Sequence, residues 1–292
     1  MVDDITVRRV KPSAGSTTVA PPPPSSTEAG LIRPVRGIYW TNWGRDTPLD
    51  SLPSEYNLLY AAFAYGDGSG TGRAVFRPDD GSGVSAAEFA RQVRVAQTQG
   101  RRVVLSIGGA NPVGLRMETQ AHVDQLVSSV SSIVDTYGFD GIDWDLEQAG
   151  TFSADTLTAA TRAFTDRYGP EFIVTAAPSP SSAPYKEFAR RVGDDLDLIT
   201  PQYYGYVSAD RVADIRWRTF ELIETYGVAP YRIGFGAKVG NDALTSPVGV
   251  WRDAVIAMQH RYPDFGGAMV WDATAERLAG NPFATTVSPA FH

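Results

Sequence analysis

Four acidic side chains lie within one short segment, residues 140–147. Apolar residues separate them, namely Ile142, Trp144 and Leu146. Such alternation is typical of a β-strand, and side chains two residues apart on a strand share a face. Asp143, Asp145 and Glu147 should therefore point the same way, with neighbouring carboxylates about 6.6 Å apart. Partly desolvated like charges raise at least one pKa, so the row suits chemistry that needs a proton donor beside a charged partner.

Structural explanations of this acidic segment compete with the chemical one. An EF-hand calcium loop that began at Asp143 would need glycine five residues later and glutamate eleven residues later. Those positions hold Gln148 and Ala154, so the segment does not fit a calcium loop. A charged edge strand is the other alternative, but such edges seldom alternate acids with large apolar residues. The pattern favours a chemical use of the carboxyl groups.

The remainder of the chain supplies elements that could position these acids. From residue 34 onward, strand-like runs alternate with helical periodicity. The expected strands are 37–40, 58–64, 103–107, 140–147, 172–177, 196–204, 232–236 and 268–271. The expected helices are 85–99, 122–137, 154–168, 185–192, 210–226 and one that begins at 246–247. Eight strands with helices between most of them predict an α/β fold, a (β/α)8 TIM barrel.

Three candidate functional residues fall at the ends of predicted strands. They are Glu147, Tyr204 and Trp271. In a (β/α)8 barrel, active side chains lie at the carboxyl ends of the strands. The predicted fold therefore gathers these residues on one face of the molecule.

Residues 140–147 resemble the active-site signature Asp-Gly-x-Asp-x-Asp-x-Glu of glycoside hydrolase family 18, the chitinase family. Six other segments are similar to motifs of this family's barrel strands. They are residues 37–40, 60–64, 106–109, 175–178, 202–204 and 266–271. The resemblance extends over about residues 35–275, which is most of the chain.

The resemblance implies roles for individual residues. Glu147 would act as general acid and then as general base, while the substrate's own N-acetyl oxygen attacks the anomeric carbon and gives retention of configuration. Asp145 would orient the acetamido group, and Asp143 would share a proton or hydrogen bond with Asp145. Tyr204 would donate a hydrogen bond to the acetamido oxygen, and Trp271 would stack under the sugar.

Further residues receive substrate-binding or supporting roles from the same resemblance. The expected substrate-binding residues, beyond Trp271, are Tyr39, Phe63, Gly108, Gly109, Gln202 and Met269. Ser106 is expected to support Asp143 from a neighbouring strand. Asp140 has the opposite strand parity from the other acids and is expected to be structural. Neither a cofactor nor a metal is implied.

Two positions depart from the family pattern, and both bear on subsite preference. Gly205 follows the tyrosine of the sixth strand where the family often has Asn or Asp, and Gln148 follows the acidic signature where many members have Tyr. Residues 236–266 are too few for the additional domain that deepens the cleft in some members. We therefore expect no large insertion between strands seven and eight, and an open groove suited to cutting within a polymer.

Composition restricts the classes of partner. The formal net charge of −7 argues against nucleic acid, because phosphate binding requires a basic surface. No apolar run is long enough to predict a membrane span, and the first residues lack the pattern of a signal peptide. The expected partner is a glycan that contains N-acetylglucosamine, with chitin as the default and with peptidoglycan and N-glycan cores as alternatives.

The first 33 residues differ in composition from the rest. They include four consecutive prolines, Pro21 to Pro24, flanked by Ser and Thr. Proline runs favour an extended spacer, so residues 1–33 are interpreted as a linker, or as an arm that docks on a larger assembly. Residues 34–292 would form the catalytic domain.

An alternative function uses the same barrel without catalysis. It is a glycan-binding or phage tail structural protein that contacts host cell-wall glycans, because fold alone does not fix function. Abundant arginine with only three lysines indicates a GC-rich genome and is compatible with an actinobacterial phage. The expected location is extracellular or in a virion, and cytoplasmic if neither applies.

Overall fold

The computed structural model describes residues 30–44, 47–110, 114–205, 211–240 and 244–291. Its strands are β1 (Val35–Thr41), β2 (Leu58–Gly66), β3 (Ala74–Val75), β4 (Arg102–Gly109), β5 (Gly141–Leu146), β6 (Ile173–Ala176), β7 (Leu198–Ile199), β8 (Gly234–Lys238) and β9 (Gly267–Trp271). Its α-helices are α1 (Ala86–Thr98), α2 (Gln120–Tyr137), α3 (Ala154–Tyr168), α4 (Ala183–Val192), α5 (Arg211–Phe220), α6 (Val248–Arg261) and α7 (Ala273–Leu278).

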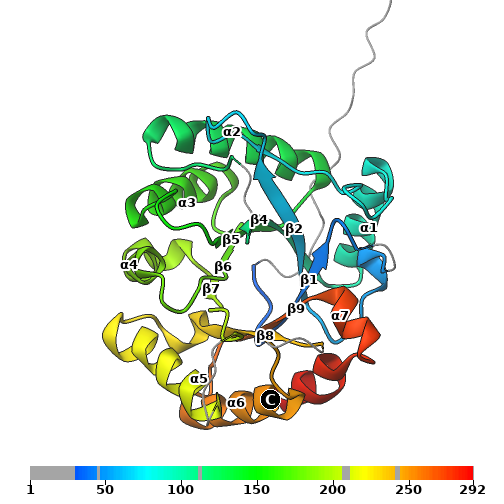
Figure 1. Ribbon diagram of the computed structural model, residues 1–292, viewed down its shortest axis with the longest axis vertical. Helices are drawn as coiled ribbons and strands as arrows, with labels where there is room; N and C mark the ends of the chain where they lie inside the picture. Colours follow the sequence, from blue (N-terminus) through cyan, green and yellow to red (C-terminus); the bar gives the residue numbers. More distant parts are fainter. Residues whose placement is uncertain (1–29, 45–46, 111–113, 206–210, 241–243, 292) are drawn as a thin grey trace, which may run out of the picture.

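Eight parallel strands form the predicted barrel, and the helices surround it (Figure 1). Neighbours follow the order β7-β6-β5-β4-β2-β1-β9-β8, and single bridges from Ile199 to Ile233 and from Gln202 to Gly236 join the two ends of this series. The short strand β3 lies outside the barrel and pairs antiparallel with β2. The predicted (β/α)8 fold is confirmed, and no large insertion separates β8 from β9 among the described residues.

The strand predicted over residues 196–204 is much shorter in the structure. β7 contains only Leu198 and Ile199, because Pro201 interrupts the pattern and has no N–H for the ladder. The backbone nevertheless continues alongside its neighbours. The amide of Gly236 donates to the carbonyl of Pro201 at 2.8 Å, and the amide of Gln202 donates to that of Pro178 at 2.9 Å. This extended segment therefore carries Gln202 and Tyr204 to the mouth of the barrel.

Two helix ends follow the signals in the sequence. Ser85 caps α1 by accepting a hydrogen bond from the amide of Glu88 at 3.2 Å. Gly138 ends α2 in the left-handed conformation, with φ of 73°. The short helix α7 and the helical turns that follow it in residues 283–290 are not predicted by the sequence pattern.

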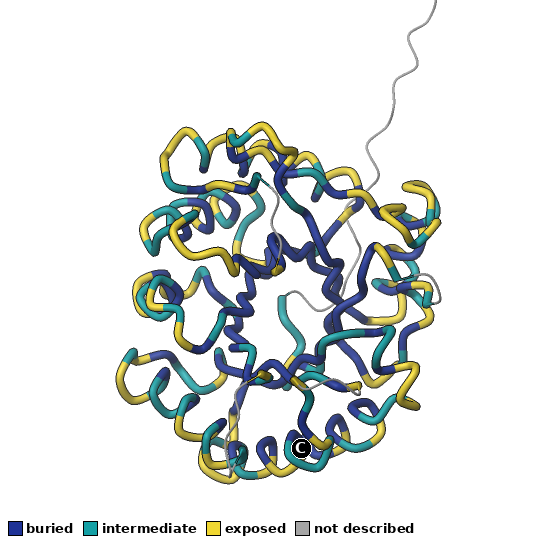
Figure 2. The backbone as a smooth tube through the Cα atoms, in the orientation of Figure 1, coloured by how far each residue is buried: buried dark blue, intermediate teal, exposed yellow. Residues whose placement is uncertain are grey.

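Two layers of apolar side chains hold the barrel together. The larger layer lies between the strands and the helices, and the smaller one fills the barrel interior. The backbone coloured by burial shows the same arrangement, with a buried ring of strands inside a shell of half-exposed helices (Figure 2). Among the described residues, no helix is both long and apolar enough to cross a bilayer.

The start of the described chain packs against the barrel. The guanidinium of Arg33 donates to the carbonyls of Tyr231 at 3.0 Å and Asp197 at 2.9 Å. The carbonyl of Gly30 accepts from Arg102 at 3.1 Å. Residues 30–33 of the predicted N-terminal segment are therefore attached to the barrel. Residues 1–29, on which the docking hypothesis depends, lie outside the described residues.

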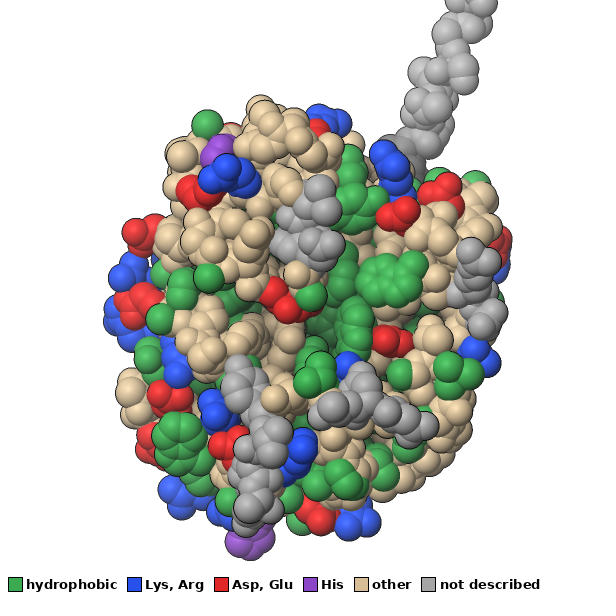
Figure 3. All heavy atoms as spheres, in the orientation of Figure 1, with side chains coloured by type: hydrophobic (Ala, Val, Ile, Leu, Met, Phe, Trp, Pro, Cys, Tyr) green, Lys and Arg blue, Asp and Glu red, His purple; other side chains and the backbone are tan. Residues whose placement is uncertain are grey.

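A cleft of about 810 Å³ opens where the strands end. The space-filling view shows this hollowed face, with acidic and hydrophobic side chains gathered at its centre (Figure 3). The cleft is the place where the predicted functional residues should meet.

Candidate active site

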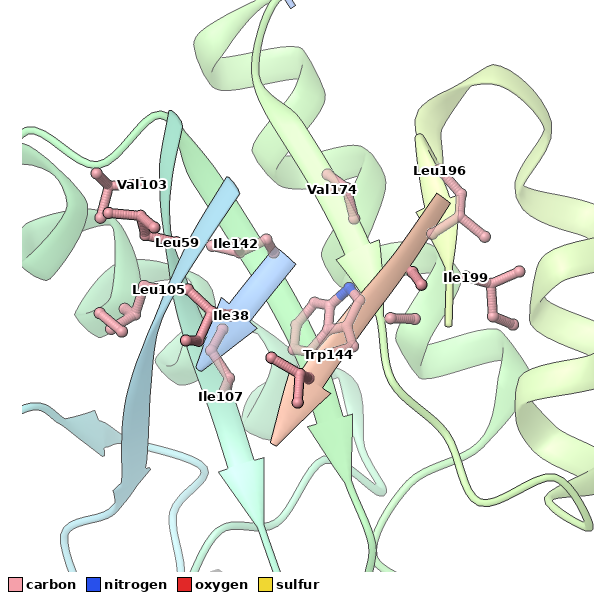
Figure 4. Packing of buried hydrophobic residues seen from close by; sticks show 14 of the residues in the cluster. Ile38, Leu59, Val103, Leu105, Ile107, Ile142, Trp144, Val174, Leu196 and Ile199 are labelled. Carbon is pink, nitrogen blue, oxygen red and sulfur yellow. The ribbon is translucent and has the colours of Figure 1, made fainter. Parts of the chain in front are cut away.

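Strand β5 carries the acidic row with the parity expected from its alternation. Ile142 and Trp144 point outward into the layer beneath the helices (Figure 4), and the indole N–H of Trp144 donates to Thr161 on α3 at 3.0 Å. Asp143 and Asp145 point the other way and are 0% and 3% exposed. Burying large apolar side chains on one face of β5 thus fixes the carboxylates on the opposite face.

Glu147 is the first residue after β5 and is open to solvent in the cleft. The side-chain amide of Gln202 donates to Asp145 Oδ1 at 2.7 Å and lies 3.3 Å from Glu147 Oε1. One amide nitrogen therefore contacts both carboxyl groups. Gln202 also donates to the carbonyl of Ala177 at 2.9 Å, which fixes the orientation of the amide.

Asp143 lies below this pair and receives three hydroxyl donors. Tyr39 and Ser106 donate to Oδ2 at 2.8 and 2.7 Å, and Thr175 donates to Oδ1 at 2.7 Å. Ser106 is therefore in the supporting position that the sequence predicts. The expected hydrogen bond between Asp143 and Asp145 is not among the contacts of these two described residues, because Asp145 turns toward Gln202 instead.

The three carboxyl groups all have raised pKa values. Burial raises the pKa of Asp143, opposed by its three hydroxyl donors. Burial and the charges of Glu147 and Asp143 hold the pKa of Asp145 well above its usual range. The walls of the cleft displace water from Glu147 and raise its pKa, which a hydrogen bond from Gln202 partly offsets. The site can therefore hold protons at a pH where ordinary carboxyl groups are ionised.

Two glycines at the end of β4 leave room for this arrangement. Gly108 has φ of +120°, and a Cβ there would lie 2.4 Å from the carbonyl oxygen of Asp145. Gly109 has φ of +83°, and a Cβ there would lie 2.7 Å from the ring of Phe63. A side chain at either position would displace an acid or an aromatic of the cleft.

An aromatic wall lines one side of the cleft. The rings of Phe63 and Trp271 stack with centroids 5.6 Å apart. Trp43 extends this wall, with its ring 6.0 Å from Phe63 and 6.2 Å from Trp271. Trp43 is 49% exposed, so one aromatic surface remains available to a ligand. Flat apolar rings of this kind suit the faces of sugars.

Most predicted site residues reach the cleft. Those on its wall are Phe63, Gly108, Gly109, Asp145, Glu147, Gln202, Tyr204 and Trp271. Burial and the charges of Asp145 and Glu147 raise the pKa of Tyr204 well above its usual value, so its hydroxyl stays protonated and can donate a hydrogen bond.

Five predicted residues do not line the cleft, namely Asp143 and its donor Ser106, described above, and Tyr39, Met269 and Asp140. Tyr39 and Met269 are each 1% exposed and lie in the barrel interior, below the cleft rather than on its wall. Asp140 lies at the start of β5, where it accepts from the amide of Val103 at 2.7 Å and from Gln97 at 3.0 Å. These contacts give Asp140 the structural role that its strand parity predicts.

Part of the cleft wall is not predicted by the sequence pattern. The additional lining residues are Asn42, Trp43, Tyr65, Asp80, Ala110, Ser179, Pro180, Lys238 and Leu244. The hydroxyl of Thr175, the third donor to Asp143, is likewise not predicted from the sequence. Several of these positions end a strand or directly follow one, including Lys238 and Asn42. Position at a strand end was thus the signal that could have identified them.

A cleft lined by carboxyl groups at the carboxyl ends of the strands of a (β/α)8 barrel is typical of glycoside hydrolases. The model of the family "Glycosyl hydrolases family 18" matches residues 36–230. Because this match covers more than half of the chain, the protein belongs to glycosyl hydrolase family 18, a family of enzymes.

Relatives in sequence carry the name chitinase. A chitinase of Enterococcus faecalis is 30% identical over 190 residues, which are 57% of this chain and 52% of the relative. Chitinase D of Niallia circulans is 30% identical over 195 residues, or 57% of this chain and 37% of the relative. The chain thus spans about half or less of the length of these relatives.

Solved structures share the fold. A family 18 chitinase from Chromobacterium violaceum has a TM-score of 0.78 at 25% identity, covering 90% of this chain and 85% of that chain. A fungal endo-β-N-acetylglucosaminidase of family 18 has a TM-score of 0.70 at 19% identity, covering 88% and 98%. The latter likeness concerns the fold alone.

Proposed function

We propose that this protein hydrolyses polymers of β-1,4-linked N-acetylglucosamine, with chitin as the default substrate and with retention of anomeric configuration. Membership of family 18 and the names of the relatives support a chitinase-like hydrolase. Peptidoglycan contains the same acetamido sugar and is the second candidate substrate.

One observation carries the proposal. Asp145 and Glu147 meet at the cleft around the amide of Gln202, while Asp143 lies buried behind them. Burial raises the pKa values of all three carboxyl groups, and the charges of Glu147 and Asp143 raise that of Asp145 further. A protonated acid beside a charged neighbour is the arrangement that general acid catalysis requires.

Glu147 is the group suited to proton transfer. It projects into the cleft, whereas Asp143 and Asp145 are buried. In the proposed reaction Glu147 protonates the glycosidic oxygen as the bond to the leaving sugar breaks. The resulting carboxylate then takes a proton from the water that attacks the anomeric carbon, so Glu147 returns to its protonated form.

Asp145 is suited to act on the substrate's acetamido group. In this proposal the acetamido oxygen attacks the anomeric carbon and forms a cyclic oxazolinium ion, which water then opens. Asp145 orients the acetamido N–H and stabilises the positive charge that develops. Tyr204, whose hydroxyl is protonated, donates a hydrogen bond to the acetamido oxygen. Trp271 stacks under the sugar at the cleavage site.

The shape of the cleft favours cutting within a polymer. Its volume of about 810 Å³ exceeds what one sugar needs, and the aromatic wall continues past Trp271 to Trp43. The described connections between β8 and β9 contain α6 but no added domain that would close one end. We therefore propose endo action on a chain that lies across the barrel mouth.

The test is release of a fluorophore from an N,N′-diacetylchitobioside by the wild type and by Glu147→Gln. The variant should lose about 10²- to 10⁴-fold in kcat, because it keeps the shape of the acid but has no proton to donate. Glu55→Gln is the matched control, since Glu55 is exposed and does not line the cleft. Near wild-type activity of Glu147→Gln would refute the role of Glu147.

Two further measurements address the substrate-assisted route. Nuclear magnetic resonance of early products should show the retained anomer. Polymers of glucose, which lack the acetamido group, should not be turned over, and comparable rates on them would contradict the mechanism.

The non-enzymatic alternative makes a different prediction. A glycan-binding protein would bind chitooligosaccharides without cleaving them, in the wild type as well as in the variant. The three carboxyl groups, the protonated tyrosine and the named relatives favour the enzyme. The phage tail alternative has no support among these relatives.

A further inference from the structure

Asp143 is surrounded by three hydroxyl donors although it is fully buried. Asp143 is 0% exposed, yet both of its oxygens accept hydrogen bonds. An ionised carboxyl group can remain in such a place only if donors replace the water that it has lost. The donors here are the hydroxyls of Tyr39, Ser106 and Thr175, at 2.7–2.8 Å.

The register of three neighbouring strands creates this arrangement. Ser106 on β4 pairs with Asp143 on β5, and Asp143 pairs with Thr175 on β6. The two hydroxyls therefore reach the carboxyl group from opposite sides. Ser106 shares Oδ2 with Tyr39, whereas Thr175 is the donor that occupies Oδ1. Without Thr175, Oδ1 would have no protein donor among the described residues.

We propose that Thr175 is a positioning residue that, together with Tyr39 and Ser106, holds Asp143 as a fixed anion behind Asp145, and that the reaction requires this anion. This inference rests on the proposed function. Thr175 does not line the cleft, so its effect on the reaction is exerted through Asp143.

The surrounding charges agree with an ionised Asp143. The titratable groups that interact with Asp143 are Asp145 on the same strand and, from neighbouring elements, Tyr39, Tyr60, Tyr185 and Tyr204. Burial raises the pKa of each of these tyrosines, so they are neutral. No cation acts on Asp143 within the part of the chain that the structure describes. Hydroxyl donors alone therefore favour its ionised form, and its charge in turn raises the pKa of Asp145.

The test is the dependence of kcat/KM on pH for Thr175→Val. Valine has nearly the same shape but no hydroxyl, so Asp143 loses the donor to Oδ1 and its pKa rises. Because activity requires ionised Asp143, the acidic limb of the profile should move to higher pH, by about one unit for the loss of a hydrogen bond to a charged group. The midpoint of the limb does not depend on the yield of folded protein.

Two control variants separate this effect from packing. Thr175→Ser keeps the hydroxyl and should keep the wild-type midpoint. Thr200→Val removes an equally buried hydroxyl that donates to the carbonyl of Ala176 at 3.3 Å and touches no carboxyl group. It should leave the acidic limb in place, whatever it does to stability.

The outcomes distinguish this inference from the proposed function. An active wild type whose acidic limb is unmoved by Thr175→Val would overturn the role of Thr175 alone. An equal shift in Thr200→Val would reduce the effect to packing and would also overturn it. Thr175→Ala provides a second variant without the hydroxyl, and it must show the same upward shift. A wild type without hydrolytic activity would instead refute the proposed function.

Discussion

Gln202 is the side chain that joins the two carboxyl groups of the cleft. Its amide contacts Asp145 at 2.7 Å and Glu147 at 3.3 Å, and these contacts lower the pKa of each group against the effect of burial. By favouring the ionised form of Glu147, this amide limits how far the pKa of Glu147 rises. Gln202, which the sequence suggests as a sugar-binding residue, therefore also adjusts the pKa of Glu147.

At the residue scale, we predict that Gln202→Met moves the basic limb of the kcat/KM profile to higher pH. The variant removes a donor that favours the ionised form, so the pKa of Glu147 rises and the acid stays protonated to a higher pH. Gln97→Met is the control, because Gln97 donates to Asp140 at 3.0 Å at the opposite end of the same strand. A limb that stays in place or moves downward would contradict the prediction.

At the scale of elements, residues on or just after three separate strands build the aromatic wall. Trp43 follows β1, Phe63 belongs to β2 and Trp271 ends β9. Phe63 and Trp271 stack on one another, and the exposed Trp43 continues their surface. Parallel strands of a barrel bring such residues together because their carboxyl ends all lie on one face.

We predict that Trp43→Ala raises KM for long chitooligosaccharides by about three- to tenfold and leaves kcat nearly unchanged, because stacking on an aromatic ring contributes about 0.5–1.5 kcal/mol. Trp217→Ala is the control. Trp217 is also exposed, at 61%, but lies on α5 outside the cleft. Steady-state kinetics over a series of oligosaccharide lengths checks this. Equal effects of the two variants would rule out a sugar-binding role for Trp43.

At the scale of the whole molecule, a buried acid connects the two ends of the barrel. Glu276 on α7 is 0% exposed and accepts from the hydroxyl of Tyr56 at 2.7 Å, 220 residues away in sequence. It also accepts from the amides of Phe283 at 3.2 Å and Ala284 at 2.8 Å. The segment after α7 is thereby attached to the chain that leads into β2.

We predict that Tyr56→Phe lowers the free energy of unfolding by about 1–3 kcal/mol, because it removes a donor from a buried carboxyl group. Denaturant titration measures this loss. Tyr262→Phe is the control, since Tyr262 donates to Glu224 at 2.9 Å in an exposed pair and should change stability by less than about 0.5 kcal/mol. Equal losses of unfolding free energy in the two variants would show that the buried hydrogen bond stabilises the protein no more than the exposed one.

The sequence by itself determined the barrel and the acidic row. Alternation of strands and helices specifies eight βα units, and alternation of acids with Ile, Trp and Leu specifies which face of β5 carries the carboxyl groups. Both are local patterns, because side-chain direction follows from spacing along one strand. The same local reasoning overextended the strand at residues 196–204, where Pro201 interrupts the ladder.

The tertiary structure decided which groups surround each acid. It placed Tyr39 beneath the cleft rather than on its wall, Thr175 against Asp143, and Gln202 between Asp145 and Glu147. These contacts join residues that are 32 to 104 positions apart in the sequence. They depend on strand register and barrel closure, which no spacing within a single segment contains.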